Sequence, residues 1–130
     1  MQNLTEQETL ILRGFAEAQR LASEIAIKRG WYTDPETGAP VERNFGEVVA
    51  LMHSELSEAL EADRRDAMDD KLPHRKGTEV EFADCIIRIL DTAAMLGLNI
   101  GGAFLEKCRY NRNRADHNLE TRNAEGGKKY

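Results

Sequence analysis

The sequence has little of what disulfide-rich, membrane-spanning and all-β proteins need. Its two cysteines, Cys85 and Cys108, have neither C-x-x-C nor zinc-site spacing, so we expect no disulfide framework or structural zinc. Aromatic residues make up only 6% of the chain, which points away from an all-β fold. The apolar runs are far shorter than the roughly 20 residues of a membrane span, and the N-terminus lacks signal-peptide regions. We therefore expect a cytoplasmic protein that does not enter a membrane.

The chain also lacks an excess of positive charge. It has 18 Lys and Arg against 23 Asp and Glu, a formal net charge of −5, so a nucleic-acid polymer is not an expected partner. An acidic chain that handles polyphosphates needs locally gathered cations or metal ions to bridge the repulsion. With 130 residues and 41% hydrophobic residues, the chain has enough apolar material for one core and little for a second.

Hydrophobic periodicity predicts four helices and no strands. The expected helices cover about residues 5–29, 44–66, 78–97 and 103–114. Three of them begin with pairs spaced as in a capping box, namely Thr5 and Glu8, Asn44 and Glu47, and Thr78 and Glu81. Gly30 should end the first helix, and Gly101 and Gly102 should form a hinge before the fourth. We expect an all-α protein resembling a four-helix bundle, with one domain over 1–114 and a polar tail over 115–130.

Acidic side chains recur at helical spacing on the second and third expected helices. Glu55 and Glu58 share one face of the second helix, and Glu81 and Asp84 share one face of the third, bordering its apolar side. If the two helices pack side by side, four carboxylates converge, and such like charges repel unless they are protonated or bridged by divalent cations. Oxygen ligands favour Mg²⁺ or Mn²⁺. The alternative is four solvated surface charges.

Two further sets of polar residues accompany these acids. Lys107, Asn111 and Arg114 lie within about 60° of arc on the fourth helix and form a stripe suited to phosphate oxygens, or else a solvated basic helix end. Arg88 and Asp91 continue the acidic stripe of the third helix, where they either pair with each other or support the metal site.

Several of these motifs together resemble one protein family. The segments 52–61 and 79–91 contain E-x-x-E and E-x-x-D, with 22 residues between Glu58 and Glu81. This pattern is similar to the signature of the MazG-like all-α nucleoside triphosphate pyrophosphohydrolases. The segments 28–31, 43–47 and 106–114 resemble flanking motifs of short, single-domain members, many of them from phages.

The resemblance implies a function and a site. It implies that Glu55, Glu58, Glu81 and Asp84 hold Mg²⁺, with Mn²⁺ as a substitute and more than one ion when substrate is bound. A (deoxy)nucleoside triphosphate would be hydrolysed between its α and β phosphates to the monophosphate and pyrophosphate. It further implies that a homo-oligomer forms, either a dimer or a dimer of dimers, in the host cytoplasm if the protein is phage-encoded. By analogy with phage members, we expect dGTP or GTP as substrate, with hydrolysis of noncanonical nucleotides, dUTP or dCTP as the open alternatives.

The resemblance also assigns individual residues. Lys107, Asn111 and Arg114 would bind phosphates, and Glu55 is our choice for helping to deprotonate the attacking water. Trp31 or the neighbouring Tyr32 would stack on the base, unless these aromatics only cover the end of the bundle. Asn44 would contact sugar or base, although its spacing to Glu47 already explains it as a helix cap.

The chain departs from the family pattern in two places. Ser54 stands where many members carry an extra glutamate, so a base at that position cannot be transferred. The segment after Arg114 is longer and different from the usual ending, which leaves open whether His117 and Lys128 reach a substrate.

Two other function classes fit parts of the pattern. A di-iron bundle would use Glu-x-x-His pairs, and this sequence contains none. A non-enzymatic helical module could bind a basic partner through its acidic stripes, and it would not depend on metal ions.

Overall fold

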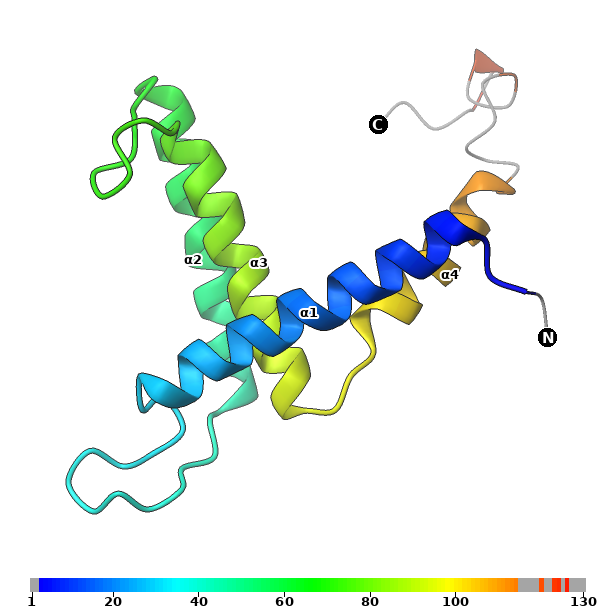
Figure 1. Cartoon of the computed structure of the whole chain (residues 1–130). Helices are drawn as coiled ribbons and strands as arrows, with labels where there is room; N and C mark the ends of the chain where they lie inside the picture. Colours follow the sequence, from blue (N-terminus) through cyan, green and yellow to red (C-terminus); the bar gives the residue numbers. More distant parts are fainter. Residues whose placement is uncertain (1–2, 115–119, 121–122, 125, 127–130) are drawn as a thin grey trace. The chain divides into compact units, whose positions relative to one another are not determined.

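The structure is a computed structural model that describes residues 3–114, 120, 123, 124 and 126 (Figure 1). It contains four helices: α1 (Glu6–Lys28), α2 (Phe45–Arg64), α3 (Gly77–Met95) and α4 (Ile100–Arg112). The described residues form no strand, only the isolated bridges Thr33 with Pro40 and Met68 with Lys76. The all-α prediction is confirmed. None of the four helices is by itself long and apolar enough to cross a membrane.

The ends of α1 follow the sequence signals. The Thr5 hydroxyl oxygen accepts from the Glu8 N–H at 3.1 Å, and the Glu8 carboxylate accepts from the Thr5 N–H at 2.9 Å. This reciprocal pair satisfies two of the N–H groups that a helix start leaves without intrahelical partners. At the other end Gly30 has a φ of 75°, a left-handed conformation that glycine adopts at little cost. The predicted cap and stop of the first helix are confirmed.

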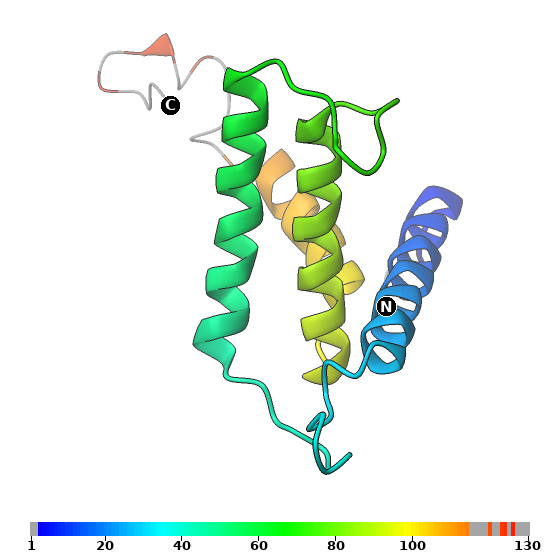
Figure 2. The same ribbon diagram turned by 90° about the vertical axis from the view of Figure 1, so that its left-hand side faces the viewer.

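Helices α2 and α3 form an antiparallel pair that runs side by side in both views (Figure 2). Asn44 caps α2, its side-chain oxygen accepting from the Glu47 N–H at 3.1 Å. The start of α3 lies against the end of α2 at Gly77, where an added Cβ would be 2.8 Å from the Ala62 Cβ. Only a glycine fits so close an approach, and this contact sets which residues of the two helices face each other.

Two predicted helix starts are wrong. Helix α3 begins at Gly77 after the N-cap Lys76, so Thr78 lies within the first turn and caps nothing. Gly101 and Gly102 are not a hinge but belong to α4, whose N-cap is Asn99. The Asn99 side-chain oxygen accepts from the Gly102 N–H at 2.9 Å, a cap bond that outweighs the low helix propensity of the two glycines.

By its backbone contacts the chain divides into two compact units. Unit 1 comprises Met1–Phe15 and Asn99–Tyr130, and unit 2 comprises Ala16–Leu98. In unit 1 the rings of Phe15 and Phe104 pack with centroids 5.0 Å apart. Also in unit 1, Arg109 on α4 donates to the Glu8 carboxylate at 2.8 Å. The prediction of one domain over 1–114 stays a prediction. Of the predicted tail over 115–130, including His117 and Lys128, most lies outside the described residues.

Unit 2 holds the second half of α1 together with α2 and α3. Its buried apolar residues are small or medium in size: Ala22, Ala26, Val48, Ala59, Cys85, Leu90 and Ala93. Two acidic side chains are buried with them, Glu55 with 7% and Asp91 with 2% of the residue exposed. Burying an acid costs free energy unless the acid is paired, so these two positions are candidates for a functional role in unit 2.

Candidate metal centre and adjoining pocket

Three of the four predicted metal ligands come together in the middle of the α2·α3 pair. Glu55, Glu81 and Asp84 each place a carboxylate oxygen so that all three oxygens lie within 4.8 Å of one another. Glu55 is buried, and the other two are partly buried. The spacing E-x-x-D places two of these acids on the face of α3 that meets α2, so helical periodicity and antiparallel packing together produce the cluster.

The fourth predicted ligand, Glu58, lies beside this group but is not one of the three. It is exposed, yet its charge acts on Glu81. Burial, followed by the neighbouring carboxylates of Glu55 and Glu58, raises the pKa of Glu81 to about 7. Burial and the charge of Glu55 also raise the pKa of Asp84. The cluster therefore holds more negative charge than its own surroundings neutralise.

One cation of unit 2 is directly bonded to the cluster. The Arg88 Nε donates to the Glu55 Oε1 at 2.5 Å, in a partly buried ion pair. Of the two roles predicted for Arg88, support of the metal site agrees with this contact, because the bond fixes one oxygen of a candidate ligand. Pairing of Arg88 with Asp91 does not agree, since Arg88 bonds to Glu55 and Asp91 accepts from Tyr32.

The donor set fits a hard divalent cation. All three side chains offer carboxylate oxygens, the ligands that Mg²⁺ and Mn²⁺ prefer, and no sulfur or imidazole is among them. The raised pKa of Glu81 has the same physical origin as metal affinity, because a cation among the three would relieve the repulsion that protonation otherwise relieves.

The predicted phosphate-binding residues belong to unit 1, whereas the cluster belongs to unit 2. Lys107 and Asn111 lie one turn apart on α4, whereas Arg114 follows the end of that helix at Arg112, so the prediction that the fourth helix carries all three residues is wrong for Arg114. Lys107 and Arg114 both contact the Tyr110 ring: the Lys107 Nζ is 4.6 Å and the Arg114 guanidinium carbon 5.7 Å from its centroid. Asn111 is partly buried. The binding of phosphates by these three residues stays a prediction.

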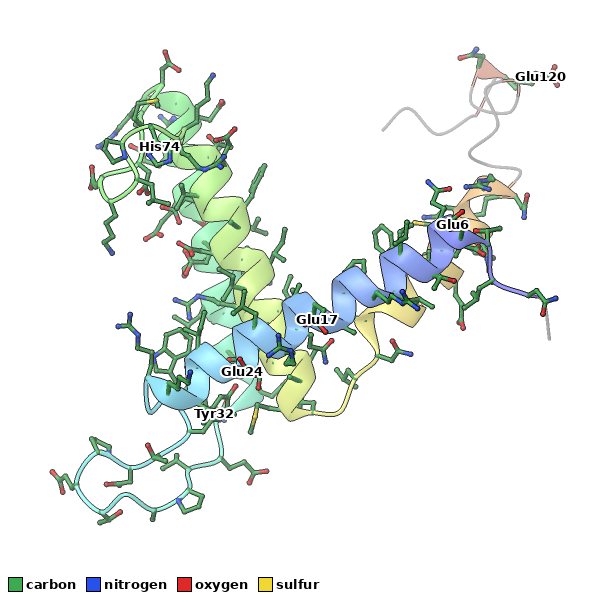
Figure 3. The ribbon with its side chains drawn as sticks, viewed as in Figure 1. Glu6, Glu17, Glu24, Tyr32, His74 and Glu120 are labelled. Carbon is green, nitrogen blue, oxygen red and sulfur yellow. The ribbon has the colours of Figure 1, made fainter. Side chains whose placement is uncertain are left out.

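The loop after α1 carries the two aromatics of the predicted base site, Trp31 and Tyr32, and Figure 3 labels the second of them. Trp31 is 42% exposed, and the Arg43 guanidinium carbon lies 5.9 Å from its ring centroid. The Tyr32 hydroxyl donates to the Asp91 Oδ2 at 2.8 Å, a bond that joins this loop to α3. Burial first, and then this bond, raises the pKa of Tyr32 to about 12. The Tyr32 hydroxyl is therefore bonded to Asp91, while its side chain also lines the pocket described next, and stacking of Trp31 or Tyr32 on a base stays a prediction.

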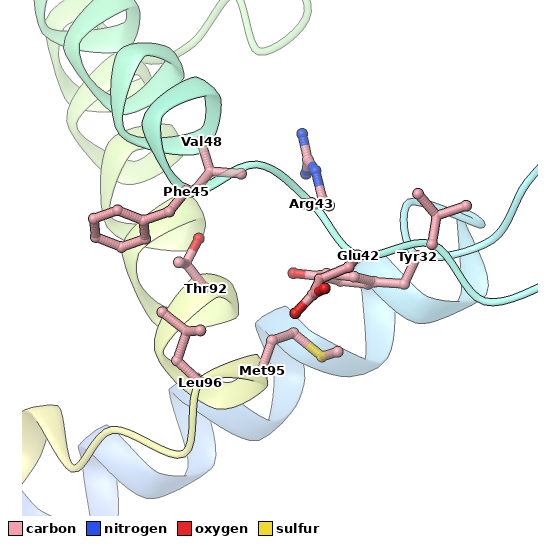
Figure 4. Close-up of a pocket in the computed structure, with 9 residues that line it drawn as sticks. Tyr32, Glu42, Arg43, Phe45, Val48, Thr92, Met95 and Leu96 are labelled. Carbon is pink, nitrogen blue, oxygen red and sulfur yellow. The ribbon is translucent and has the colours of Figure 1, made fainter.

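A pocket of about 300 Å³ opens at this end of the α2·α3 pair (Figure 4). Phe45 and Val48 from α2 and Thr92 and Met95 from α3 line it, with Arg43 from the loop on its rim. This volume is at the lower end of the range for small-molecule sites, and mostly apolar walls with a few polar groups are typical of them. No local sequence signal predicts this cavity, because the pocket depends on how the loop lies across the ends of two helices.

Sequence reasoning named Asp91 but missed its partner. Tyr32 is 59 residues away in sequence, and only the fold of unit 2 brings the two together. A carboxylate in the largely apolar C-terminal half of the third helix was the available signal. Asn44, predicted to contact sugar or base, uses its side-chain oxygen as the cap of α2.

Comparisons with known proteins leave the chain without an assigned family: no protein-family model, no curated protein and no solved structure matches it.

Proposed function

We propose that this protein is a metal-dependent nucleoside triphosphate pyrophosphohydrolase, with dGTP or GTP as the preferred substrate. The observation that carries the proposal is the convergence of Glu55, Glu81 and Asp84 within 4.8 Å of one another on an antiparallel helix pair. The resemblance of the E-x-x-E and E-x-x-D segments to the MazG-like signature supports the reaction type.

Each acid would contribute in a different way. Glu81 and Asp84 lie one turn apart on α3 and would hold the cation from one side, while Glu55 would hold it from α2, with Arg88 fixing its other oxygen. Mg²⁺ or Mn²⁺, when bound, supplies neutralisation of the polyphosphate and lowers the pKa of a coordinated water. Glu58 stays a proposed ligand for a second ion, and Glu55 our proposed acceptor of the proton that the attacking water loses.

The basic face of α4 would supply the remaining phosphate contacts. Lys107 and Arg114 both contact the Tyr110 ring, which reduces the freedom that each long side chain would lose on binding a phosphate. We propose that these two cations and Asn111 hold phosphate oxygens away from the metal-bound end of the substrate.

The test is product analysis with metal and nucleotide varied independently. The protein is incubated with Mg²⁺ or Mn²⁺ and each common NTP and dNTP, and the products are separated by ion-exchange chromatography. The expected products are nucleoside monophosphate and equimolar pyrophosphate, which should disappear in Glu81→Gln and persist in Glu61→Gln. Glu61 is a suitable control because it lies on α2 but pairs with Arg65 at 2.6 Å, outside the cluster. Diphosphate plus orthophosphate would overturn the proposed bond position, and no turnover would favour a non-enzymatic module.

A second copy of the chain is the partner we propose. On α2 the exposed Leu56 and Leu60 share one face, and on α3 the exposed Phe82 and Ile86 share another. Both faces are turned away from the carboxylates by helical periodicity, so association through them would leave the cluster open. Exposed apolar surface of this kind marks interaction sites, and light scattering should give the mass of a dimer or tetramer.

A further inference from the structure

Asp91 is a buried acid with only half of its hydrogen-bonding capacity used. It is 2% exposed, and its Oδ2 accepts from the Tyr32 hydroxyl. Its Oδ1 is fully buried and has no hydrogen-bond partner among the described residues. Buried polar atoms without partners are rare, because each costs about 1–3 kcal/mol. An atom that is kept in this state is a candidate for contact with a ligand.

This unpartnered oxygen belongs to a side chain that lines a small hollow beside the pocket. The hollow, of about 10 Å³, is lined by Trp31, Arg88 and Asp91 together with Arg43, Val48 and Thr92. The last three residues also line the 300 Å³ pocket, so the two spaces adjoin. The hollow is large enough only for a group of about the size of water, whereas the pocket can take a ring system. A ligand in the pocket could therefore direct a polar edge toward Asp91.

The position of Asp91 relative to the metal cluster fits a nucleotide. Asp84 and Asp91 are seven residues apart on α3, so they lie on the same side of the helix and about 10 Å apart along its axis. Arg88 lies between them, bonded to Glu55 on one side and lining the hollow on the other. Phosphates at the cluster would thus leave a ribose to span the gap and a base to enter the pocket.

We infer that Asp91 selects the base of the substrate by accepting N–H groups on its free oxygen, and that the base it selects is guanine. Guanine presents two adjacent donors, N1–H and the 2-amino group. Adenine and cytosine place a ring acceptor next to their single amino group, and thymine flanks its one N–H with two carbonyl oxygens. Those acceptors would face a carboxylate oxygen and repel it. This inference deepens the proposed function and rests on it for the identity of the ligand as a nucleotide.

The environment of Asp91 keeps the free oxygen in place. Tyr32 fixes the other oxygen from the loop, which orients the carboxylate. Arg43 lines the hollow together with Asp91, and its positive charge favours the ionised form of that carboxylate. The Arg43 guanidinium carbon also lies 5.9 Å from the centroid of the Trp31 ring. The specificity would come from one acceptor in a buried site, where a mismatched partner is costly.

Binding of nucleoside monophosphates without metal tests this inference separately from catalysis. Trp31 is the one tryptophan of the chain and lines the hollow, so its fluorescence can report binding in EDTA. The full-length protein is titrated with dGMP, dIMP, dAMP, dCMP and dTMP, and the affinities are confirmed by calorimetry. We expect dGMP to bind at least about tenfold more tightly than dAMP, dCMP or dTMP, with dIMP, which lacks the 2-amino group, in between.

Two variants locate the effect. Asp91→Asn should lose the preference for dGMP, since the single amide oxygen that accepts from Tyr32 leaves an NH2 donor at the position of the free oxygen. Tyr32→Phe should weaken dGMP binding, because it removes the bond that orients the carboxylate, but should leave dGMP the preferred nucleotide, because the Asp91 Oδ1 stays an acceptor. Equal binding of the five nucleotides by the unaltered protein, or an unchanged dGMP preference in Asp91→Asn, would overturn the inference. Tight dGMP binding without any triphosphate turnover would instead overturn the proposed function and leave the role of Asp91 standing.

Discussion

The α2·α3 pair buries acidic side chains at two places, and the two places differ in what they lack. In the middle, Glu55, Glu81 and Asp84 crowd together with one bonded cation, Arg88. At the end, Asp91 is alone and receives one neutral hydrogen bond from Tyr32. In both places burial is the largest cause that raises a carboxyl pKa, at Glu81 and at Asp91.

The difference lies in the partner that each place requires. At the cluster, carboxylate repulsion adds to burial, and a divalent cation removes both costs at once. At Asp91 no second carboxylate contributes, and Tyr32 and Arg43 already offset part of the burial cost. What Asp91 lacks is a hydrogen-bond donor. Acidic residues on one helix pair can therefore form both a site for a cation and a site that recognises a hydrogen-bond donor of a ligand.

The largest expected effect is on catalysis at the crowded place. Glu55→Gln, Glu81→Gln and Asp84→Asn should each lower dGTP turnover by at least about 10²-fold, because each removes a metal ligand whose contribution is several kcal/mol. Steady-state rates at saturating Mg²⁺ measure this loss. Asp91→Asn should lower turnover of dGTP relative to dATP without abolishing either. If Asp91→Asn were as damaging as the cluster variants for every nucleotide, the two places would not have separate roles.

The second effect concerns the ion pair that joins the two places. Arg88→Met should lower the free energy of unfolding by about 2–3 kcal/mol in EDTA, because it leaves Glu55 buried without its cation. Urea denaturation measures the change. Adding Glu55→Gln to the same protein should recover most of the loss, and Mg²⁺ should recover part of it. A loss below about 0.5 kcal/mol would mean that the pair behaves as a solvated surface bridge.

The lone carboxylate gives a smaller effect on stability. Tyr32→Phe removes the one donor to Asp91 and should lower the free energy of unfolding by about 1–2 kcal/mol. Tyr110→Phe is the matched control, since Tyr110 is 59% exposed and keeps its ring against Lys107 and Arg114. Equal urea midpoints for the two variants would contradict the importance of the Tyr32 bond.

Features that depend on a few neighbouring residues could be predicted from the sequence, whereas contacts between residues distant in sequence could not. Hydrophobic spacing located all four helices, and capping pairs located the starts of α1 and α2, because these signals act within a few residues. The start of α3 was missed because its N-cap, Lys76, makes no side-chain cap bond, and the close approach of Gly77 to Ala62 involves a residue distant in sequence. The start of α4 was missed because two successive glycines were interpreted as a hinge, whereas the Asn99 side chain caps the helix in front of them.

The same distinction between local signals and long-range contacts applies to the candidate site. The spacing of E-x-x-D gave Glu81 and Asp84 a common face, and the assumption that α2 and α3 are neighbours brought in Glu55. The pairing of Arg88 with Glu55, and of Tyr32 with Asp91, depends on register between helices and on a loop path that no local spacing encodes. The pocket arises from the same loop path.

The smallest expected effect, and the one that separates the two places most directly, is on the pH dependence of stability. The folded-state pKa of Glu81 is about 7 against an ordinary value of 4.5, so the folded protein binds more protons than the unfolded chain between these values. In EDTA the free energy of unfolding should therefore fall as pH rises from about 4.5 through 7. The fall should be about 1 kcal/mol, because solvent screens the partly exposed cluster, and thermal melts measure it.

Mg²⁺ should reverse this fall, since it competes with protons for the same oxygens. The rise in Tm on adding Mg²⁺ should be greater at about pH 8 than at about pH 5, and both the fall and the pH-dependent rise should be smaller in Glu81→Gln, in which the raised pKa of Asp84 and Asp91 still contributes. Asp91→Asn should retain the Mg²⁺ response, because Asp91 lies about two turns of α3 from Asp84. An equal Mg²⁺ response at both pH values would mean that the cation binds somewhere other than the crowded carboxylates.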